Sequence, residues 1–130
     1  MPSYRYQVRS PGGQTVERII DMYPASQQNQ IRAMLADTLQ AVISQTLFKR
    51  TDSKGMVPAV EVLLCTPAVR NIIREGRTFE IPNVIETNRS MGMCSLDSAI
   101  AELYFNGMVS REDAIAQAAY PDKLDKQLAA

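Results

Sequence analysis

The sequence predicts an α+β fold that is mostly α: helices, then one β-hairpin, then a helical bundle. Residues 41–50 and 56–65 have strand character and flank TDSKG, which has the length of a hairpin connection. From residue 66 onward, possible helix caps and stops recur, and no further strand is indicated. A chain of 130 residues is large enough for one hydrophobic core, so we expect an ordinary single domain.

Residues 1–13 differ in composition from those that follow. In SYRYQVRS, Tyr4, Tyr6 and Val8 alternate with polar residues, which predicts a half-exposed strand. The sequence Pro11-Gly12-Gly13 ends that strand, because proline and glycine favour turns. We therefore treat residues 1–13 as a separate N-terminal arm.

Two helices are predicted before the hairpin. TVERIIDMYP has apolar residues at helical spacing, and Pro24 ends that helix. Ser26 can cap a longer helix. The apolar stripe of the longer helix comprises Ile31, Met34, Leu35, Thr38 and Leu39.

The first hairpin strand, AVISQTLFKR, fits a helical period as well as a strand period. We favour a strand because a turn and the second strand, MVPAVEVLLC, follow it. In that second strand Glu61 is a single carboxylate without an obvious partner. We expect Glu61 to face solvent, since unpaired charges are rarely buried.

TPAVRNIIREG, residues 66–76, is a short helix with clear ends. Thr66 can cap it, Pro67 suits the first helical position, and Gly76 suits the left-handed residue after the last turn. Arg70 and Arg74 are four residues apart on one stripe, where like charges cost a few tenths of a kcal/mol. Periodicity alone favours two solvated arginines on an amphipathic helix.

Three further helices are predicted after residue 76. A short one lies around IPNVIETN, and SLDSAIAELYFNG runs from a possible cap at Ser95 to a stop at Gly107. SREDAIAQAAYP begins with Ser110 and ends before Pro121. The C-terminal residues 122–130 are polar, and we expect a frayed tail.

Composition excludes several classes of function. The 14 basic and 14 acidic residues give a net charge of zero, which argues against a nucleic-acid binder. No apolar run approaches the roughly 18 residues of a membrane-spanning helix, so we expect no direct membrane insertion. The N-terminus lacks an apolar signal region, and Cys65 and Cys94 lack metal-site spacing, so we expect buried thiols in a reducing cytosol.

The sequence also lacks the residues that an active site needs. The chain has no histidine, which excludes imidazole-based acid–base, triad and metal chemistry. It has no G-x-x-x-x-G-K-[ST] phosphate loop. We interpret Cys94 as a small buried side chain and Met91, Met93 and Met108 as core-filling residues. We predict no catalytic residue and no metal ligand.

AVRNIIRE, residues 68–75, resembles the AIRNLIRE motif of the PilT-type type IV pilus retraction (twitching motility) ATPases. Six of the eight positions agree, and Val69 and Ile72 are conservative differences. Sequence on both sides is also similar to the C-terminal portion of that family, in the family's order, from about residue 14 to residue 121. Residues 1–13 depart from the family and faintly resemble the opening of the membrane platform protein, of PilC or GspF type, that works with these ATPases.

The resemblance implies a C-terminal part of a RecA-like ATPase domain. Residues 14–65 would end the RecA-like core, and residues 66–121 would form a C-terminal helical subdomain. Family members bind ATP and Mg²⁺ through Walker A, Walker B, aspartate and histidine boxes, none of which is present in this chain. We therefore expect no cofactor in this chain and no catalysis by it alone, and whether it is an enzyme stays open.

The function implied is that of a C-terminal fragment of the motor, which contributes subunit packing and couples ATP-driven motion to the pilus machine. The implied partners are other ATPase subunits, in a homo-hexamer, and the inner-membrane platform protein. The implied location is cytoplasmic, peripheral to the inner membrane. Two alternatives remain: a stand-alone, non-catalytic interaction or regulatory module that docks on a pilus or type II secretion assembly, and an ATPase subunit whose catalytic part is a separate chain.

The resemblance also implies a role for the short helix, because the family's helix is implicated in retraction and not in nucleotide chemistry. We therefore expect a coupling surface that consists of Arg70, Asn71, Arg74 and Glu75, where guanidinium groups would meet carboxylates of a partner. The apolar face that supports this surface consists of Val69, Ile72 and Ile73.

Overall fold

The computed structural model describes residues 12–129, so the strand predicted within residues 1–13 lies outside the described residues. The fold is α+β and mostly helical, with one antiparallel hairpin, as the sequence predicts. Its elements, in chain order, are α1 (Gly12–Asp21), α2 (Ala25–Thr38), β1 (Ala41–Lys49), β2 (Met56–Leu64), α3 (Pro67–Arg74), the 3-10 helix η1 (Thr78–Glu80), α4 (Ile81–Thr87), the 3-10 helix η2 (Arg89–Met91), α5 (Leu96–Phe105), α6 (Arg111–Gln117) and α7 (Pro121–Leu128).

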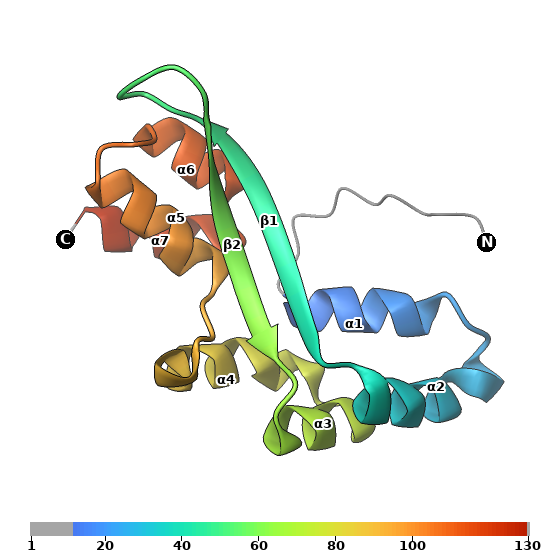
Figure 1. The fold of residues 1–130 in the computed structure, drawn as a ribbon. Helices are drawn as coiled ribbons and strands as arrows, with labels where there is room; N and C mark the ends of the chain where they lie inside the picture. Colours follow the sequence, from blue (N-terminus) through green and yellow to red (C-terminus); the bar gives the residue numbers. More distant parts are fainter. Residues whose placement is uncertain (1–11, 130) are drawn as a thin grey trace.

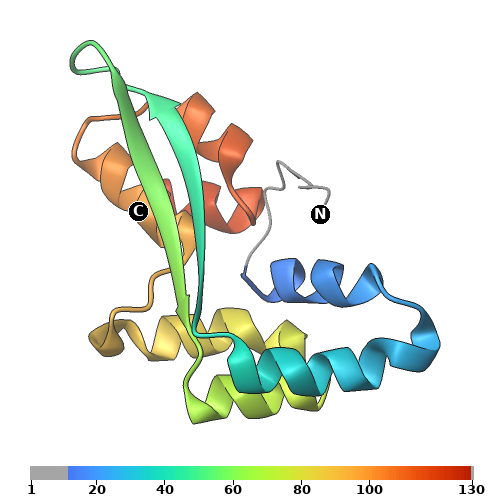
Figure 2. The ribbon, with the colours of Figure 1, turned by 45° about the vertical axis from the view of Figure 1, so that its right-hand side comes forward.

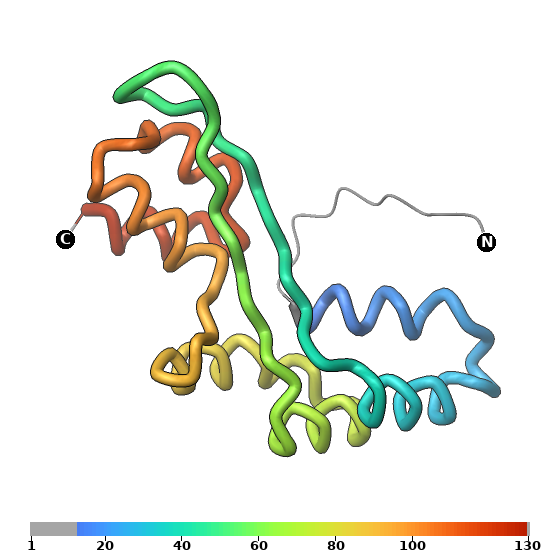
Figure 3. The backbone as a smooth tube through the Cα atoms, viewed as in Figure 1, coloured from blue at the N-terminus to red at the C-terminus, as the bar shows by residue number. Residues whose placement is uncertain are grey.

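The long hairpin runs through the molecule and joins two groups of helices (Figure 1). Helices α1–α4 gather at the end where β1 begins and β2 ends, and α5–α7 lie beside the half that carries the hairpin loop (Figures 1 and 2). The tube in Figure 3 shows that the chain reaches α5 from α4 by a connection that passes close to β2. Within that connection Cys94 forms an isolated bridge with Val62 of β2, through N–O distances of 2.9 and 3.2 Å.

Each group of helices has its own apolar core. The core of α1–α4 includes Val16, Ile20, Leu63, Val69, Ile73, Ile81 and Ile85. The core of α5–α7 includes Phe48, Ala59, Leu96, Ile100, Val109, Ala114 and Leu124. Because β2 contributes Leu63 to one core and Ala59 to the other, the hairpin connects the two cores.

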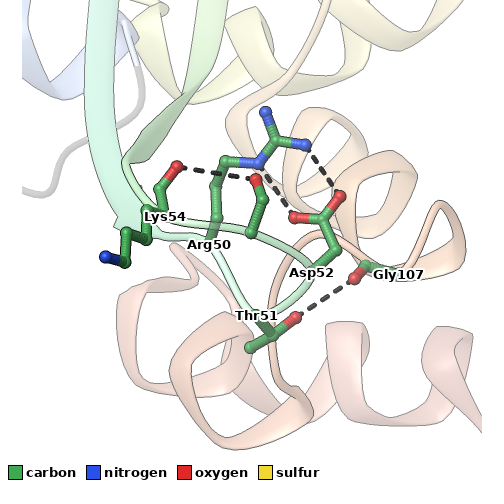
Figure 4. Close-up of polar contacts among 6 residues, drawn as sticks. Arg50, Thr51, Asp52, Lys54 and Gly107 are labelled. Atoms are coloured by element: carbon green, nitrogen blue, oxygen red, sulfur yellow. Dashed lines mark hydrogen bonds and ion pairs between the residues drawn. The ribbon is translucent and has the colours of Figure 1, made fainter.

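The hairpin loop is fixed to the turn between α5 and α6 (Figure 4). The N–H of Thr51 donates to the carbonyl of Met108 at 3.0 Å, and its hydroxyl donates to the carbonyl of Gly107 at 3.1 Å. The guanidinium of Arg50 donates to both carboxylate oxygens of Asp52, at 2.8 and 2.7 Å. The loop therefore packs against the second group of helices.

The predicted helix ends are confirmed where a side chain caps the helix. The hydroxyls of Thr66, Ser95 and Ser110 accept backbone N–H groups three residues later, at 3.4, 3.2 and 3.1 Å. Gly76 and Gly107 have φ of 72° and 74°, the left-handed conformation that glycine adopts without strain after a helix. The capping residues in the sequence were therefore sufficient to predict where α3, α5 and α6 begin.

Gly12 and Gly13 do not form the turn that the sequence suggested, because α1 begins at Gly12. A Cβ on Gly13 would lie 2.7 Å from the carbonyl oxygen of Thr78, closer than side chains tolerate. Glycine is therefore needed there because the start of α1 packs directly on η1.

The prediction of a frayed tail over residues 122–130 is wrong. Residues 121–128 form α7, in which Pro121 occupies the first turn. Leu124 and Leu128 lie four residues apart on one face and are both buried in the core of α5–α7. Two apolar residues in a polar segment are a weak sequence signal, but they are enough to bury one face of a short helix.

Other exposure predictions also needed the tertiary structure. Glu61 is 2% exposed and not solvent-facing, because it lies on the same face of β2 as Ala59 and Leu63. Met93 is buried as predicted, whereas Met91 is exposed in η2. The predicted apolar stripe of α2 is only partly correct. Ile31, Leu35 and Leu39 pack on the core, whereas Met34 and Thr38 are exposed. The predicted cap by Ser26 is absent, because the helix already begins at Ala25.

Candidate interaction site on α2 and α3

Helix α3 is held in the molecule by its apolar side. Val69, Ile72 and Ile73 are all buried in the core that α1–α4 share. Because these residues recur at helical spacing, the opposite side of the helix is directed away from that core. Helix α2 lies beside α3 along this boundary (Figures 1 and 2).

Arg70 joins α3 to the C-terminal end of α2. Its guanidinium donates to the carbonyl oxygen of Ala36 at 2.6 Å and to the side-chain oxygen of Gln40 at 3.4 Å. The last carbonyls of a helix have no partner within the helix and carry the negative end of its dipole. Arg70 therefore caps the C-terminal end of α2 and offsets the negative end of its dipole. The arginine is half-buried and not fully exposed.

Arg74 is bound one turn further along α3. It donates to the carboxylate of Asp37 in α2 at 2.7 Å and to the side-chain oxygen of Asn71 at 3.1 Å. Stacking two cations at four-residue spacing is favourable here because each faces a separate acceptor group on α2. The sequence did not show these acceptors, because the whole hairpin separates α2 from α3 along the chain.

The remaining predicted site residues lie on the surface. Asn71 and Glu75 are exposed, and the carboxylate of Glu75 accepts from Arg77 at 2.7 Å. Arg77 also pairs with Glu80 of η1. The structure therefore brings Asn71, Arg74 and Glu75 together on an exposed polar surface, and Arg70 lies beneath its edge.

A second polar cluster, which sequence reasoning missed, fixes α1 to α2 and η1. The guanidinium of Arg32 donates to both carboxylate oxygens of Glu17, at 2.7 and 2.9 Å, and the hydroxyl of Thr78 donates to the same carboxylate at 2.6 Å. The hydrogen bonds from Arg32 lower the pKa of Glu17, despite partial burial that acts in the opposite direction. The pKa of the Arg32 guanidinium is raised by the same hydrogen bonds.

The described residues offer little for catalysis or metal binding. Burial raises the pKa of the Cys65 and Cys94 thiols, so both stay protonated at neutral pH and are poor nucleophiles. Among residues 12–129 no three cysteine or acidic side chains are grouped closely enough to hold a metal ion. A hollow between α4, α5 and α7 contains Asp97, but its carboxylate already accepts the N–H groups of Ala119 and Tyr120 at 2.7 and 2.9 Å.

A helix that spans a membrane must be both long and apolar. Over the part of the chain that the structure describes, every helix is too short or too polar to cross a membrane.

Comparison with known proteins finds similarity to pilus retraction ATPases. The chain is 41% identical over 108 residues to the type IV pilus retraction ATPase PilT of Pseudomonas aeruginosa, which is 83% of this chain and 31% of the relative. It is also 41% identical over 100 residues to a twitching motility protein of Neisseria gonorrhoeae, which is 77% of this chain and 27% of that protein. The chain is thus a counterpart of the C-terminal portion of PilT-type pilus retraction ATPases.

The fold is similar to part of a solved PilT structure. A crystal structure of the pilus retraction motor PilT with bound ADP superposes with a TM-score of 0.77 and 30% identity, over 88% of this chain and 32% of that one. This chain thus spans about a third of the length of the PilT proteins that it matches. No family model matches the sequence.

The match to PilT includes α3. Any continuous stretch of 108 residues in a chain of 130 contains residues 23–108, and therefore contains α2, the hairpin and α3. The resemblance of AVRNIIRE to the family motif is therefore part of a relationship that extends over most of the chain.

Proposed function

We propose that this chain acts as the C-terminal portion of a PilT-type pilus retraction ATPase and couples ATP-driven motion to the pilus machine. The observation that carries the proposal is the 41% identity to PilT across a stretch that includes α3. In this proposal ATP and Mg²⁺ bind to the ATP-binding core of the motor. The partners are neighbouring subunits of a hexameric ring and the platform protein, at the cytoplasmic side of the inner membrane.

The exposed polar surface of α3 is the proposed coupling surface. Arg74 is 45% exposed, and an exposed ion pair such as Arg74–Asp37 contributes only about 0–1 kcal/mol. A carboxylate of a partner can therefore compete with Asp37 for this guanidinium at little cost. Asn71 and Glu75 lie beside it and supply hydrogen-bonding groups of both kinds. Arg70 acts as a positioning residue, because its contacts with Ala36 and Gln40 hold α3 against α2.

The test is a chimera in which residues 12–129 of this chain replace the matching C-terminal region of the Pseudomonas aeruginosa PilT, in a strain without its own PilT. Twitching is measured in the strain, and ATP hydrolysis is measured on the purified chimera. If the proposal holds, the chimera twitches, and Arg74→Ala reduces twitching at least severalfold while ATP hydrolysis stays within about twofold. That split would separate coupling from catalysis.

Arg111→Ala is the matched control, because Arg111 is an equally exposed arginine, 46% against 45%, and is paired with Asp125. It should leave both readouts unchanged. A chimera that hydrolyses ATP but twitches equally well with Arg74→Ala would contradict the coupling role. A chimera that folds and hydrolyses ATP but never twitches would contradict the retraction function itself.

A further inference from the structure

Two adjoining hollows form a groove between the two groups of helices. The first hollow, of about 350 Å³, lies between α4, α5 and α7, and the second, of about 500 Å³, lies beside the start of α1. Phe79, Pro82 and Tyr120 line both hollows, so the two share a wall. We call the two hollows together the aromatic groove. Each has a volume within the range of roughly 300–1,000 Å³ in which proteins hold ligands.

The shared wall exposes aromatic surface to water. Phe79 is 78% exposed, more than any other large hydrophobic residue within residues 12–129, and Tyr120 is 45% exposed. Pro82 lies between them in the lining and is half-buried. Aromatic side chains that are exposed in a hollow with a polar rim are typical of a binding surface.

The first hollow is also acidic. Its lining includes three carboxylates, one of which belongs to Glu86, and a single ammonium group, that of Lys123. The carboxylate of Glu86 accepts the hydroxyls of Ser95 and Ser98 at 2.8 and 3.4 Å. None of the ion pairs formed within residues 12–129 includes Glu86. The aromatic groove therefore favours a ligand that is both aromatic and cationic.

The chain leaves the described residues beside this groove. Gly13 lines the second hollow, and a Cβ on it would lie 3.3 Å from the Cβ of Ile81, at the start of α4. Glu86 is five residues further along α4, a rise of about 7.5 Å. Residues 1–11 precede this point and can span up to about 36–40 Å. The length of this segment is thus ample to reach both hollows.

Residues 4–9 have the chemistry that the groove favours. Tyr4, Tyr6 and Val8 alternate with polar residues, two of which are Arg5 and Arg9. The sequence of residues 1–11 contains no aspartate or glutamate. The segment therefore combines aromatic and cationic side chains, and its charge is opposite to that of the first hollow.

We propose that residues 4–9 dock in the aromatic groove of the same chain. The tyrosines pack against Phe79 and Tyr120, and an arginine lies beside Glu86. Because exposed ion pairs contribute little affinity, the aromatic contacts hold the segment and the charges orient it. Weak contacts suffice, since attachment at Gly12 gives the segment an effective concentration on the order of mM at the groove. The resemblance to PilT-type ATPases begins at about residue 14, so this proposal is independent of the proposed function.

The test uses the whole 130-residue chain, which contains no tryptophan. Tyr6→Trp therefore introduces a single fluorescent reporter. We expect quenching of its emission by acrylamide to be at least threefold weaker than in a chain that also carries Phe79→Ala and Tyr120→Ala. Phe105→Ala is the matched control, because Phe105 is 58% exposed on α5 and lies outside both hollows, and it should leave the quenching unchanged.

Charge reversal gives a second readout with the same reporter. Glu86→Arg should increase the quenching at least twofold, and the further changes Arg5→Glu and Arg9→Glu should restore the protection. Glu112→Arg is the control, since it reverses an exposed carboxylate outside the groove. Circular dichroism of each variant shows whether the helices are retained, so that loss of docking is distinguished from loss of the fold.

Three results would overturn the proposal. The reporter is quenched as strongly in the chain with the intact groove as in the variant without its two aromatics. The reporter is protected, but neither the aromatic nor the charge variants change that protection, so the segment binds elsewhere. The protection rises with protein concentration, which would identify a second copy of the chain as the occupant of the groove.

Discussion

Single charged residues join elements that are distant in this chain. Glu61 lies in the middle of β2, and its carboxylate accepts the N–H of Leu96 at 3.1 Å, at the N-terminus of α5. The first N–H groups of a helix lack partners within the helix and lie at the positive end of its dipole, so a buried carboxylate is stabilised there. Arg70 plays the mirror role at the C-terminal end of α2.

We predict that Glu61→Ala lowers the free energy of unfolding by about 2–3 kcal/mol, since it leaves the N–H of Leu96 buried and unpaired. Glu61→Gln should cost less than half as much, because its side-chain oxygen can still accept that N–H. Urea denaturation followed by circular dichroism measures both. The control is Glu112→Ala, at an exposed position in the first turn of α6, which should change stability by about 0.5 kcal/mol or less. Equal stability of Glu61→Ala and the unmodified chain would contradict the capping role.

At the scale of elements, helices that carry their own caps were predictable and helices that depend on a neighbour were not. Helices α3, α5 and α6 each begin with a threonine or serine that accepts an N–H three residues later. Helix α7 has no side-chain cap and owes its position to two leucines packed against α5 and α6. Tertiary burial, and not propensity, accounts for most helix stability in proteins.

We predict that Leu124→Ala destabilises the protein by about 3 kcal/mol, because Leu124 is fully buried and the cavity is only partly closed by relaxation. The neighbouring Lys123 is exposed, and Lys123→Ala is expected to change stability by less than about 0.5 kcal/mol. Thermal and urea unfolding of the two variants should therefore differ clearly. If both variants unfolded at the midpoint of the parent chain, residues 121–128 would be frayed in solution after all.

At the scale of the whole molecule, the first group of helices is closed by the cluster of Glu17, Arg32 and Thr78, which binds α1, α2 and η1 to one another. Its pH dependence has a definite sign. The pKa of Glu17 is lower in the folded state than in the unfolded state, so protons bind the unfolded state first as the pH falls. The stability that the cluster contributes is therefore complete above the ordinary glutamate pKa of about 4.3 and is lost progressively below it.

We predict that Glu17→Gln reduces stability by about 1–3 kcal/mol at pH 7, where it removes charge-assisted hydrogen bonds. The difference between this variant and the parent chain should shrink as the pH is lowered from 5 to 3. Urea unfolding at a series of pH values gives that difference directly. Glu112→Gln, which changes an exposed carboxylate, should show no such trend. A gap for Glu17→Gln that stays constant down to pH 3 would mean that the pKa of Glu17 is not lowered.

The sequence by itself determined the fold class, the hairpin and the capped helices, because periodicity, turn residues and caps act over a few neighbouring residues. It also showed the resemblance to the C-terminal portion of PilT-type ATPases, since AVRNIIRE and its flanks can be compared residue by residue. Only the tertiary structure decided which face of β2 is buried, what Arg70 and Arg74 bind, and that α7 is ordered. The partners of those arginines and of Glu61 belong to other elements, far away along the chain, and no local pattern encodes that separation. The exposure of Ile43 and Leu47 likewise could not be read from the sequence, because an apolar strand residue looks the same there whether it is exposed or buried.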